Sequence, residues 1–296
     1  MHPETRVALA LVAPTLIAVV GLFLYPLGLT LVFSFGRVDL ATFSVAEFVG
    51  FSNYMRIIRD PSFQAIALRT VYFGAFISLA TTIIAFLFSL LLNQAFWGRG
   101  IVRVAVIVPW AVPSVVAGIL WGQMFNAQHG FINGLIRVLG GEGGTIWLGE
   151  PMLALHAIII AETWRGLPLA TLVLLAGLQM LPSSVYEAAD VDGATAWQKF
   201  RHVTIPLMWP LLLPLLILQF VFAMKSFDII FVLTGGGPRM GTTTLNYYVY
   251  QRGLEAFRFG DAAAAAYILT ILMLLVIGAL AFVRWRQGLR EGEAPE

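Results

Sequence analysis

The charge-free apolar segments of this chain constrain its fold more than any other feature. Four of them contain no Asp, Glu, Lys or Arg: residues 7–36, 70–98, 104–136 and 262–283. Two further apolar segments, 151–186 and 203–238, contain only two charged residues each. About 20 apolar residues in a helix cross the ~30 Å hydrocarbon core of a bilayer. The pattern therefore predicts an all-α polytopic membrane protein with six transmembrane helices. The expected spans are about 7–34, 70–95, 104–125, 152–181, 206–233 and 262–284.

Composition agrees with one membrane domain over residues 1–296. Hydrophobic residues make up 59% of the chain and charged residues 11%, and the mean hydropathy is +0.85, far from soluble-domain averages. The chain has no cysteine, which excludes disulfides and thiolate metal sites. His129, His156 and His202 lack the spacing of metal ligands, so no metal site is expected. No basic patch interleaved with aromatic residues suggests a nucleic-acid partner.

The orientation in the membrane is predicted from the basic residues. The connecting segments on the two sides of the membrane carry equal numbers of basic residues. One set of segments is much shorter, however, and so has a higher density of positive charge. Short basic segments face the cytoplasm, so both termini are expected inside. Residues 36–69 then form an outer (periplasmic) loop, in which 53–60 read as a surface helix and the next helix begins after Pro61. Residues 182–205 form a cytoplasmic loop.

That cytoplasmic loop contains the longest polar stretch between two strongly apolar segments, EAADVDGATAWQKFRHVTIP over residues 187–206. The pattern predicts two short helices that meet at Gly193, and Ser183 and Ser184 are placed to cap the first of them. Trp197, Phe200 and Val203 recur at a spacing of three and would share one face. Such a face suits a groove on another protein. A helix that rests on lipid headgroups would explain the same periodicity.

The spacing of this stretch resembles the EAA loop of bacterial ABC importer permeases. Residues 187–189 are EAA, Gly193 follows, and the stretch ends at Pro206, with Val203 and Ile205 where the family pattern has Ile and Leu. Further motifs extend the resemblance over essentially the whole chain: PWAVP at 109–113, LTGGGP at 233–238 and FGDAAAAAY at 259–267. Together they are similar to the maltose-type first permease subunit of carbohydrate importers.

The resemblance implies the type I ABC importer permease fold and a heteromeric complex in a bacterial or archaeal inner membrane. The expected partners are a second permease subunit, two cytoplasmic ATPase subunits, an extracytoplasmic solute-binding protein and membrane lipid. ATP and Mg²⁺ would be bound by the ATPase subunits, since this chain has no G-x-x-x-x-G-K-[ST] motif and needs no cofactor of its own. The residues that the resemblance assigns to ATPase coupling are Glu187, Ala188, Ala189, Asp192, Gly193, Trp197, Phe200 and Pro206.

Charged residues inside the predicted spans are the candidates for a substrate path, because an ionisable group in a membrane normally faces protein or water. Glu162 and Arg165 are three residues apart in the fourth span, and Lys225 and Asp228 repeat that spacing in the fifth, so each pair can form an internal salt bridge. Alternatively, these groups contact the solute together with nearby aromatic and amide side chains. The candidate path residues are Trp110, Gln123, Asn126, Trp164, Arg165, Lys225, Ser226, Phe227 and Asp228.

The expected function is therefore ATP-driven, binding-protein-dependent import of a sugar by alternating access, with a di- or oligosaccharide favoured over a monosaccharide. Lys225 leaves open an anionic solute such as glycerol-3-phosphate or another polyol or sugar phosphate. A stand-alone secondary transporter would commonly show internal repeats and its own coupling-ion site, which this sequence lacks. A membrane enzyme would need a fuller constellation of acid, base or nucleophile than Glu162 and Arg165.

Overall fold

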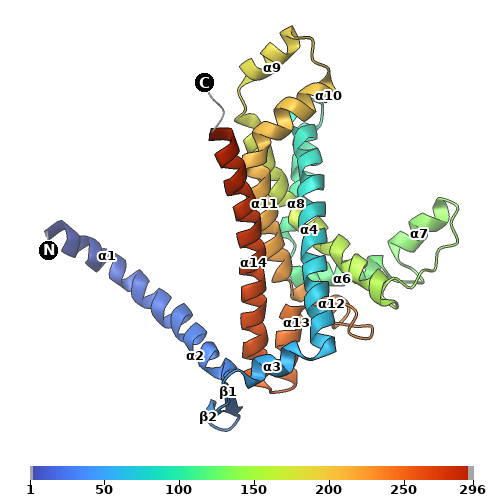
Figure 1. Ribbon diagram of the computed structural model, residues 1–296. Coiled ribbons are helices and arrows are strands. Elements are labelled where there is room, and N and C mark those ends of the chain that lie inside the picture. Colours follow the sequence, from blue (N-terminus) through green and yellow to red (C-terminus); the bar gives the residue numbers. More distant parts are fainter. Residues whose placement is uncertain (1–2, 293–296) are drawn as a thin grey trace. The chain divides into compact units, whose positions relative to one another are not determined.

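The computed structural model describes residues 3–292, and its contacts divide the chain into two compact units. Unit 1 consists of residues 1–66 and 248–272, and unit 2 of residues 67–247 with the residues from 273 onwards. Helix is the dominant secondary structure in both of them (Figure 1).

Unit 1 begins with a long apolar helix and a small hairpin. Helix α1 (Pro3–Val19) passes through a π-helical turn, η1 (Val20–Leu24), into α2 (Tyr25–Ser34). The strands β1 (Gly36–Asp39) and β2 (Ser44–Phe48) then pair antiparallel, with Arg37 opposite Glu47. Helix α3 (Ser52–Ile58) follows, and α4 (Pro61–Asn93) begins at Pro61. A helix in the predicted segment and the predicted start at Pro61 are confirmed, whereas the sequence did not predict the hairpin.

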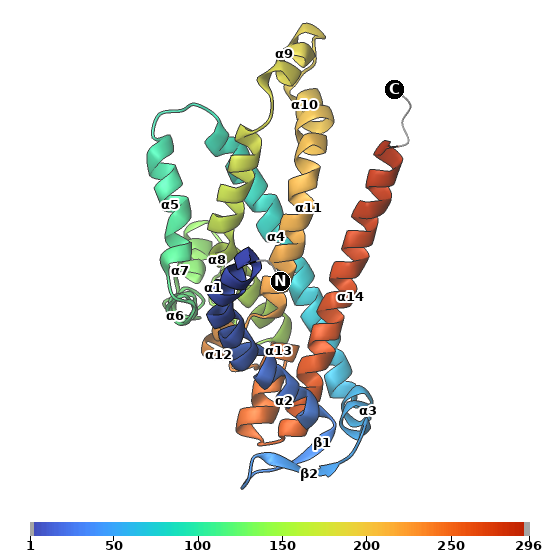
Figure 2. The same ribbon diagram turned by 90° about the vertical axis from the view of Figure 1, so that its left-hand side faces the viewer.

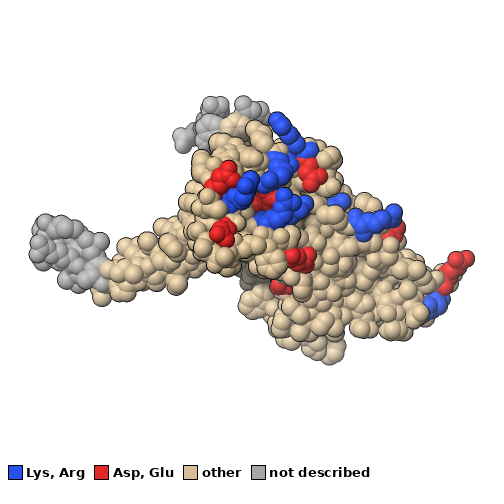
Figure 3. Space-filling view, turned by 90° about the horizontal axis from the view of Figure 1, so that it is seen from below, with Lys and Arg blue, Asp and Glu red and all other residues tan. Residues whose placement is uncertain are grey.

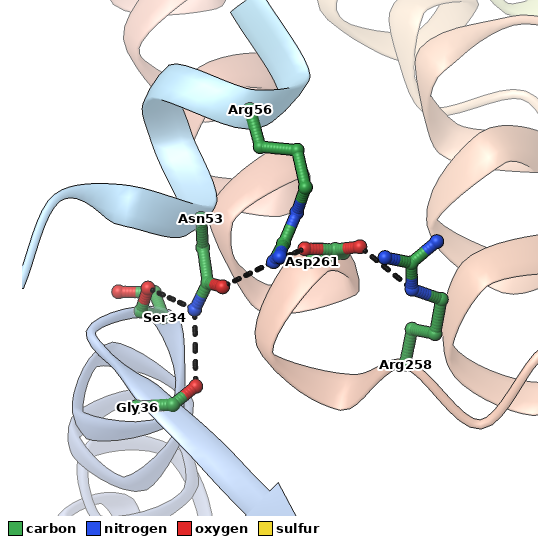
Figure 4. Close-up of polar contacts among 6 residues, drawn as sticks. All are labelled: Ser34, Gly36, Asn53, Arg56, Arg258 and Asp261. Atoms are coloured by element: carbon green, nitrogen blue, oxygen red, sulfur yellow. Dashed lines mark hydrogen bonds and ion pairs between the residues drawn. The ribbon is translucent and has the colours of Figure 1, made fainter. Parts of the chain in front are cut away.

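Asn53 of α3 joins three segments of unit 1 (Figure 4). Its side-chain amide donates to the carbonyls of Ser34, at the end of α2, and Gly36, in β1, both at 3.0 Å. The start of α14 (Phe259–Gly292) packs closely here, since a Cβ on Gly260 would lie 2.6 Å from the Gly36 carbonyl oxygen. A buried amide thus satisfies backbone groups where the chain leaves a helix.

Asp261 lies beside Asn53 and is 5% exposed. Its carboxylate forms ion pairs with Arg56 of α3 and with Arg258, whose Nε lies 3.0 Å from Asp261 Oδ2 (Figure 4). Arg56 Nη2 also donates to Asn53 Oδ1 at 2.5 Å. Seen from below, basic and acidic side chains gather in a mixed area near the centre of the view, and further charged side chains lie towards its right-hand side (Figure 3). The cluster links α3 to the first turn of α14.

An Asp261→Ala substitution is expected to lower the stability of the protein by about 1–3 kcal/mol, because it leaves the hydrogen-bond donors of two guanidinium groups without their acceptor. The measurement is the thermal unfolding midpoint of the detergent-solubilised protein. Glu255→Ala, which removes an exposed carboxylate from the same unit, is the matched control. Equal midpoints for the two variants would contradict the structural role of Asp261.

Unit 2 is built on α4, α8 (Pro151–Gln179) and α11 (Ile205–Met224), which run side by side in both ribbon views (Figures 1 and 2). One hydrophobic cluster joins these helices, and it comprises Ala85, Phe86, Ala170, Leu174, Leu178, Met208 and Leu215. Helix α5 (Arg99–Ala111) packs along α8, and α6 (Ser114–Met124) and α7 (Phe131–Val138) follow it. The remaining helices of unit 2 are α9 (Ser183–Val191), α10 (Ala196–Lys199) and α12 (Asp228–Leu233), with the π-helical turn η2 (Phe200–Thr204). Helix α13 (Leu245–Tyr250) begins in unit 2, and the π-helical turn η3 (Gln251–Glu255) follows it in unit 1.

Among the described residues, five helices are long and apolar enough to cross a membrane. They are Leu11–Ser34, Pro61–Asn93, Pro151–Gln179, Ala196–Met224 and Phe259–Phe282. The third predicted span, 104–125, is not straight, because α5 and α6 meet at an angle of 105°. Val112 is extended there, with ψ 123°, as expected for a residue that precedes a proline. The six predicted spans are thus five helices and one bent pair.

The fifth predicted span, 206–233, is also interrupted. Helix α11 ends at Met224, and α12 begins only at Asp228. The three residues between carry no Pro or Gly, and side chains from elsewhere satisfy polar groups of the break, as when Asn246 Nδ2 donates to the Lys225 carbonyl at 2.8 Å. The expectation that Lys225 and Asp228 share one helical face is therefore wrong.

Helix α12 packs against α6 and leads into a compact loop. A Cβ on Gly118 of α6 would lie 3.0 Å from Val232, so the absence of a side chain lets the two helices approach closely. After α12, Gly235 has φ +56° and ends the helix as the GGGP motif predicts. Arg69 of α4 holds the loop that follows, since its Nη1 donates to the Met240 carbonyl at 2.8 Å.

Candidate functional site

A cavity of about 370 Å³ lies in unit 2 where the two interrupted helices face α8. Discontinuous helices at membrane depth are tolerated where they border a cavity, and they form the solute sites of many transporters. The volume of the cavity falls within the range of small-molecule sites, about 300–1,000 Å³. The lining residues are Ile77, Trp110, Ser114, Glu162, Arg165, Gly166, Leu169, Gln219, Phe222, Ala223, Lys225, Ser226, Phe227 and Asp228.

Glu162 of α8 organises the polar part of this cavity. Its side chain is 5% exposed, and its Oε2 accepts hydrogen bonds from Nε and Nη2 of Arg165, both at 3.1 Å. The other carboxylate oxygen accepts a hydrogen bond from the Ser226 hydroxyl. The predicted Glu162–Arg165 ion pair is confirmed, and Glu162 in addition attaches α8 to the break between α11 and α12.

Lys225 and Asp228 line the same cavity without pairing with each other. The described part of the chain contains no ion pair between them, because the helix break separates them, and both side chains are exposed. The second predicted salt bridge is therefore wrong. With Glu162 and Asp228 negative and Arg165 and Lys225 positive, the formal charge of the lining is zero.

Aromatic surface makes up another part of the lining. Trp110 comes from the last turn of α5, Phe222 from α11, and Phe227 from the break, where its ring stacks on Phe231 at 5.4 Å between centroids. Of the predicted path residues, the cavity brings together Trp110, Arg165, Lys225, Ser226, Phe227 and Asp228.

The other three predicted path residues lie outside the cavity. Gln123 faces His129, with Oε1 3.3 Å from Nε2, and Asn126 Oδ1 accepts the backbone N–H groups of Gln128 and His129 at 2.9 and 3.1 Å. Trp164 packs edge-on against Trp121, with ring centroids 5.9 Å apart. These side chains shape the turn after α6 and the contact of α6 with α8.

The sequence-based list also omits Gln219, which the cavity includes. Gln219 is the only residue of the 20-residue helix α11 with a polar hydrogen-bonding side chain, apart from the indole of Trp209. A single amide in an otherwise apolar helix is a signal that could have identified it, because an unpaired amide in hydrocarbon is costly.

The coupling segment, defined here as residues 182–206, consists of two short helices on either side of Gly193. Helix α9 ends at Val191, Gly193 has φ +73°, and α10 begins at Ala196. Thr195 caps α10 through reciprocal hydrogen bonds with Gln198, at 3.3 and 2.7 Å. Helix α10 then continues through η2 into α11 as one helix from Ala196 to Met224. The second short helix is thus the beginning of a candidate span rather than a separate element.

Two side-chain contacts close the coupling segment on itself. Lys199 Nζ lies 2.5 Å from Asp190 Oδ1, and the hydroxyl groups of Tyr186 and Thr204 lie 3.0 Å apart. Helix α9 is thereby held against the first turns of the long helix. The N-cap of α9 is Pro182, without a side-chain hydrogen bond, so the expected serine cap is not formed and Glu187 lies in the middle of α9.

The two aromatic residues of the coupling segment differ in their surroundings. Trp197 is 66% exposed. Phe200 stacks on Phe86 of α4, with ring centroids 6.1 Å apart, and packs against the hydrophobic cluster of unit 2. The ring centroids of Trp197 and Phe200 lie 5.4 Å apart. Phe200 thus anchors Trp197 to the helices and leaves Trp197 as the accessible aromatic surface. The other coupling candidates are exposed or half-buried, namely Glu187, Ala188, Ala189, Asp192, Gly193 and Pro206.

Candidate spans around a polar cavity define a helical membrane transport protein. The chain belongs to the family of binding-protein-dependent transport system inner membrane components, whose family model matches residues 92–287. This range includes the cavity residues of α5, α6, α8, α11 and α12 and the whole coupling segment.

Relatives support the same assignment over almost the full chain. The chain is 36% identical over 277 residues to the trehalose/maltose transport system permease protein MalF of Thermococcus litoralis, covering 93% of this chain and 92% of that protein. It is 34% identical over 287 residues to the sn-glycerol-3-phosphate transport system permease protein UgpA of Agrobacterium fabrum, covering 95% and 94%.

A solved structure has the same fold. It is the crystal structure of a bacterial ABC transporter involved in the import of the acidic polysaccharide alginate, which matches with a TM-score of 0.82 and 21% identity over 96% of both chains. The chain is therefore an ABC transporter permease subunit, which is not itself an enzyme, as the resemblance implied.

Proposed function

We propose that this permease imports a neutral sugar, a di- or oligosaccharide, by alternating access through the cavity beside α8. The observation that carries the proposal is the composition of the cavity, which combines zero formal charge with hydroxyl, amide and aromatic groups. Sugars offer hydroxyls to polar groups and an apolar ring face to aromatic ones. A relative named for trehalose and maltose supports the same class of solute.

The coupling segment supports an ATP-driven mechanism. The helix Ala196–Met224 has 29 residues and a length of about 43 Å at 1.5 Å per residue, whereas ~30 Å suffices to cross the hydrocarbon. Its first turns therefore project from the membrane, and the same continuous helix ends at the cavity. A force applied near Trp197 would displace Gln219 and Phe222 at the other end.

The coupling segment also follows directly from α8, which carries Glu162 and Arg165. Movement of the segment would therefore shift two cavity walls relative to each other, as alternating access requires. We place this segment and both termini on the cytoplasmic side. The partners are two ATPase subunits that bind ATP and Mg²⁺, a second permease subunit, and an extracytoplasmic solute-binding protein that delivers the sugar.

An anionic solute is the second candidate. Lys225 is exposed in the cavity without an ion-pair partner among the described residues, and a relative is named for sn-glycerol-3-phosphate. A lysine so placed attracts a phosphate. Asp228 lines the same cavity, however, and repels an anion, so we favour the neutral sugar.

Uptake by the complete transporter distinguishes the two solutes. The test uses proteoliposomes that contain this chain with its partner subunits and solute-binding protein. We expect them to accumulate radiolabelled trehalose or maltose when ATP is supplied on the side of the membrane that carries the ATPase subunits. Excess glycerol-3-phosphate should compete at least about tenfold less well than unlabelled sugar. Competition in the opposite order would favour the anionic solute, and accumulation by this chain alone would contradict an ATP-driven importer.

A further inference from the structure

A second cavity, of about 240 Å³, lies entirely in unit 1 and shares no residue with the cavity beside α8. It is smaller than the sites of drug-sized ligands, about 300–1,000 Å³, so it suits a small chemical group. Its wall comes from β1, from the start of α3 and from the first turn of α14. The transport path proposed above makes no use of this cavity.

The charged groups in the wall of this cavity do not balance. Three of the lining residues are arginines, namely Arg37, Arg56 and Arg258. Asp261 supplies one carboxylate, so the described lining has a formal charge of +2. Glu47, outside the lining, pairs with Arg37 at 2.9 Å between Oε2 and Nη1, which lowers the local total to +1. A phosphodiester carries one negative charge and would complete the balance.

The arginines also keep hydrogen-bond donors for a ligand. Arg56 and Arg258 approach Asp261 from opposite sides (Figure 4), and Arg258 uses only its Nε for that contact, 3.0 Å from Oδ2. Within residues 3–292, the two terminal nitrogens of Arg258 make no hydrogen bond. A guanidinium group carries its donors in a planar fork that matches the oxygens of a phosphate. Arg258 is therefore held in place by one donor, and the others remain for an anion.

The cavity lies where two candidate membrane spans of unit 1 end. The span Leu11–Ser34 ends two residues before Gly36, and the span Phe259–Phe282 begins in the cavity wall. Lipid headgroups lie just outside the hydrocarbon that such spans cross. Phe257, in the wall, and Phe48, opposite Gly36 in the hairpin, are both exposed. Exposed phenylalanine suits the boundary between headgroups and acyl chains, so the position favours a lipid-borne phosphate over a free one.

We propose that this cavity binds the phosphate of an anionic phospholipid in the outer leaflet. Arg258 and Arg37 hold the phosphate oxygens, and the acyl chains lie on the apolar surface of α2, where Leu31 and Val32 are exposed. Basic pockets beside membrane helices bind anionic headgroups in the same way. The choice of leaflet rests on the cytoplasmic placement of both termini proposed above. Phosphatidylglycerol fits better than phosphatidylcholine, because a choline group adds positive charge beside the arginines.

The first test titrates the complete transporter in detergent with dioctanoyl phosphatidylglycerol, dioctanoyl phosphatidylcholine and inorganic phosphate. A ligand of the folded state raises the thermal unfolding midpoint in proportion to its occupancy. Phosphatidylglycerol should act at concentrations about fivefold or more below those that either of the other two compounds requires. Equal potency of the two lipids would overturn the role of charge. Equal potency of inorganic phosphate would overturn the lipid as the source of the phosphate. The titration needs no sugar, so its outcome is independent of the proposed solute.

Variants assign the effect to this cavity. Arg37→Gln removes a guanidinium group whose ion pair with Glu47 is exposed and so contributes little to stability. It should weaken phosphatidylglycerol about fivefold, whereas Glu47→Gln, which raises the charge near the cavity, should strengthen it. Arg59→Gln is the matched control, because Arg59 is an exposed arginine at the end of α3 outside the lining. Equal affinities in Arg37→Gln and Arg59→Gln would contradict the proposed site.

A carboxylate of the solute-binding protein is the other anion that could reach these arginines. ATP hydrolysis in nanodiscs of phosphatidylcholine alone separates the two ligands, since these membranes contain no anionic lipid. If the cavity binds lipid, Arg37→Gln and the wild type should respond equally to the binding protein there. A loss of stimulation in Arg37→Gln under these conditions, without a matching loss in Arg59→Gln, would assign the cavity to the binding protein and overturn the proposal.

Discussion

Substitution of Gly193 by valine is expected to reduce sugar-stimulated ATP hydrolysis by the assembled transporter at least about tenfold. Gly193 has φ +73°, and a residue other than glycine in the left-handed region costs about 1–2 kcal/mol, with β-branched residues the least tolerated. No atom lies within 4 Å of a Cβ at this position. The expected effect therefore comes from a changed backbone path between α9 and α10 rather than from a steric clash.

The measurement is ATPase activity with and without the sugar-loaded binding protein. Gly193→Asn is the matched variant, because asparagine adopts the left-handed conformation more readily, and it should keep most of the stimulation. Gly134→Val is a second control. It makes the same substitution on α7, at a glycine where an added Cβ also meets no atom within 4 Å. Full stimulation in Gly193→Val would show that the bend does not transmit force between the ATPase and the permease.

Truncation of Trp197 is expected to weaken binding of the ATPase subunits. Large aromatic residues dominate protein interfaces, and their replacement by alanine often costs 2 kcal/mol or more, which corresponds to about a 30-fold loss of affinity. Trp197 is 66% exposed, so its removal should leave the folded chain intact. Co-purification of the ATPase with the tagged permease, followed by titration of the complex in detergent, measures the loss.

Trp97 is the matched control for this experiment. It lies between α4 and α5, is 96% exposed, and falls in a segment that the charge distribution also places on the cytoplasmic side. Trp97→Ala should therefore retain the ATPase. Similar losses in both variants would indicate a general effect of surface tryptophans on the membrane or detergent, as expected for a helix that only rests on lipid headgroups. Phe200→Ala is not suitable alone, because its ring packs on Phe86.

Local patterns predicted several features of this molecule well. The apolar segments located α4, α8 and α14, because the hydrocarbon requirement acts on each segment separately. Only α8 was predicted nearly to both ends, since α4 begins well before the predicted span and α14 ends well after it. Gly193 and the polar stretch around it predicted the two helices of the coupling segment, because helix period and glycine conformation are also local properties. The Glu162–Arg165 pair was also predictable, since a spacing of three in one unbroken helix brings side chains together.

The errors concern residues whose position depends on distant partners. Lys225 and Asp228 have the same spacing as Glu162 and Arg165, yet a break separates them, and that break is held by Ser226 bonded to Glu162 and by Asn246 bonded to the Lys225 carbonyl. Gln123, Asn126 and Trp164 are polar or aromatic residues of apolar segments, as the cavity residues are. Gln123 and Asn126 instead make hydrogen bonds in the turn after α6, and Trp164 packs against Trp121 of α6, so none of the three lines the cavity.

The sequence by itself determined that the chain is a helical membrane protein with a polar coupling segment, because hydropathy, helix period and glycine conformation are local properties. The tertiary structure alone decided where the spans break and which polar groups meet. Glu162 and Gln219 lie far apart in the sequence, on two helices, and the cavity that they line with Ser226 does not exist until those helices pack. The cavity therefore depends on long-range contacts that no local pattern records.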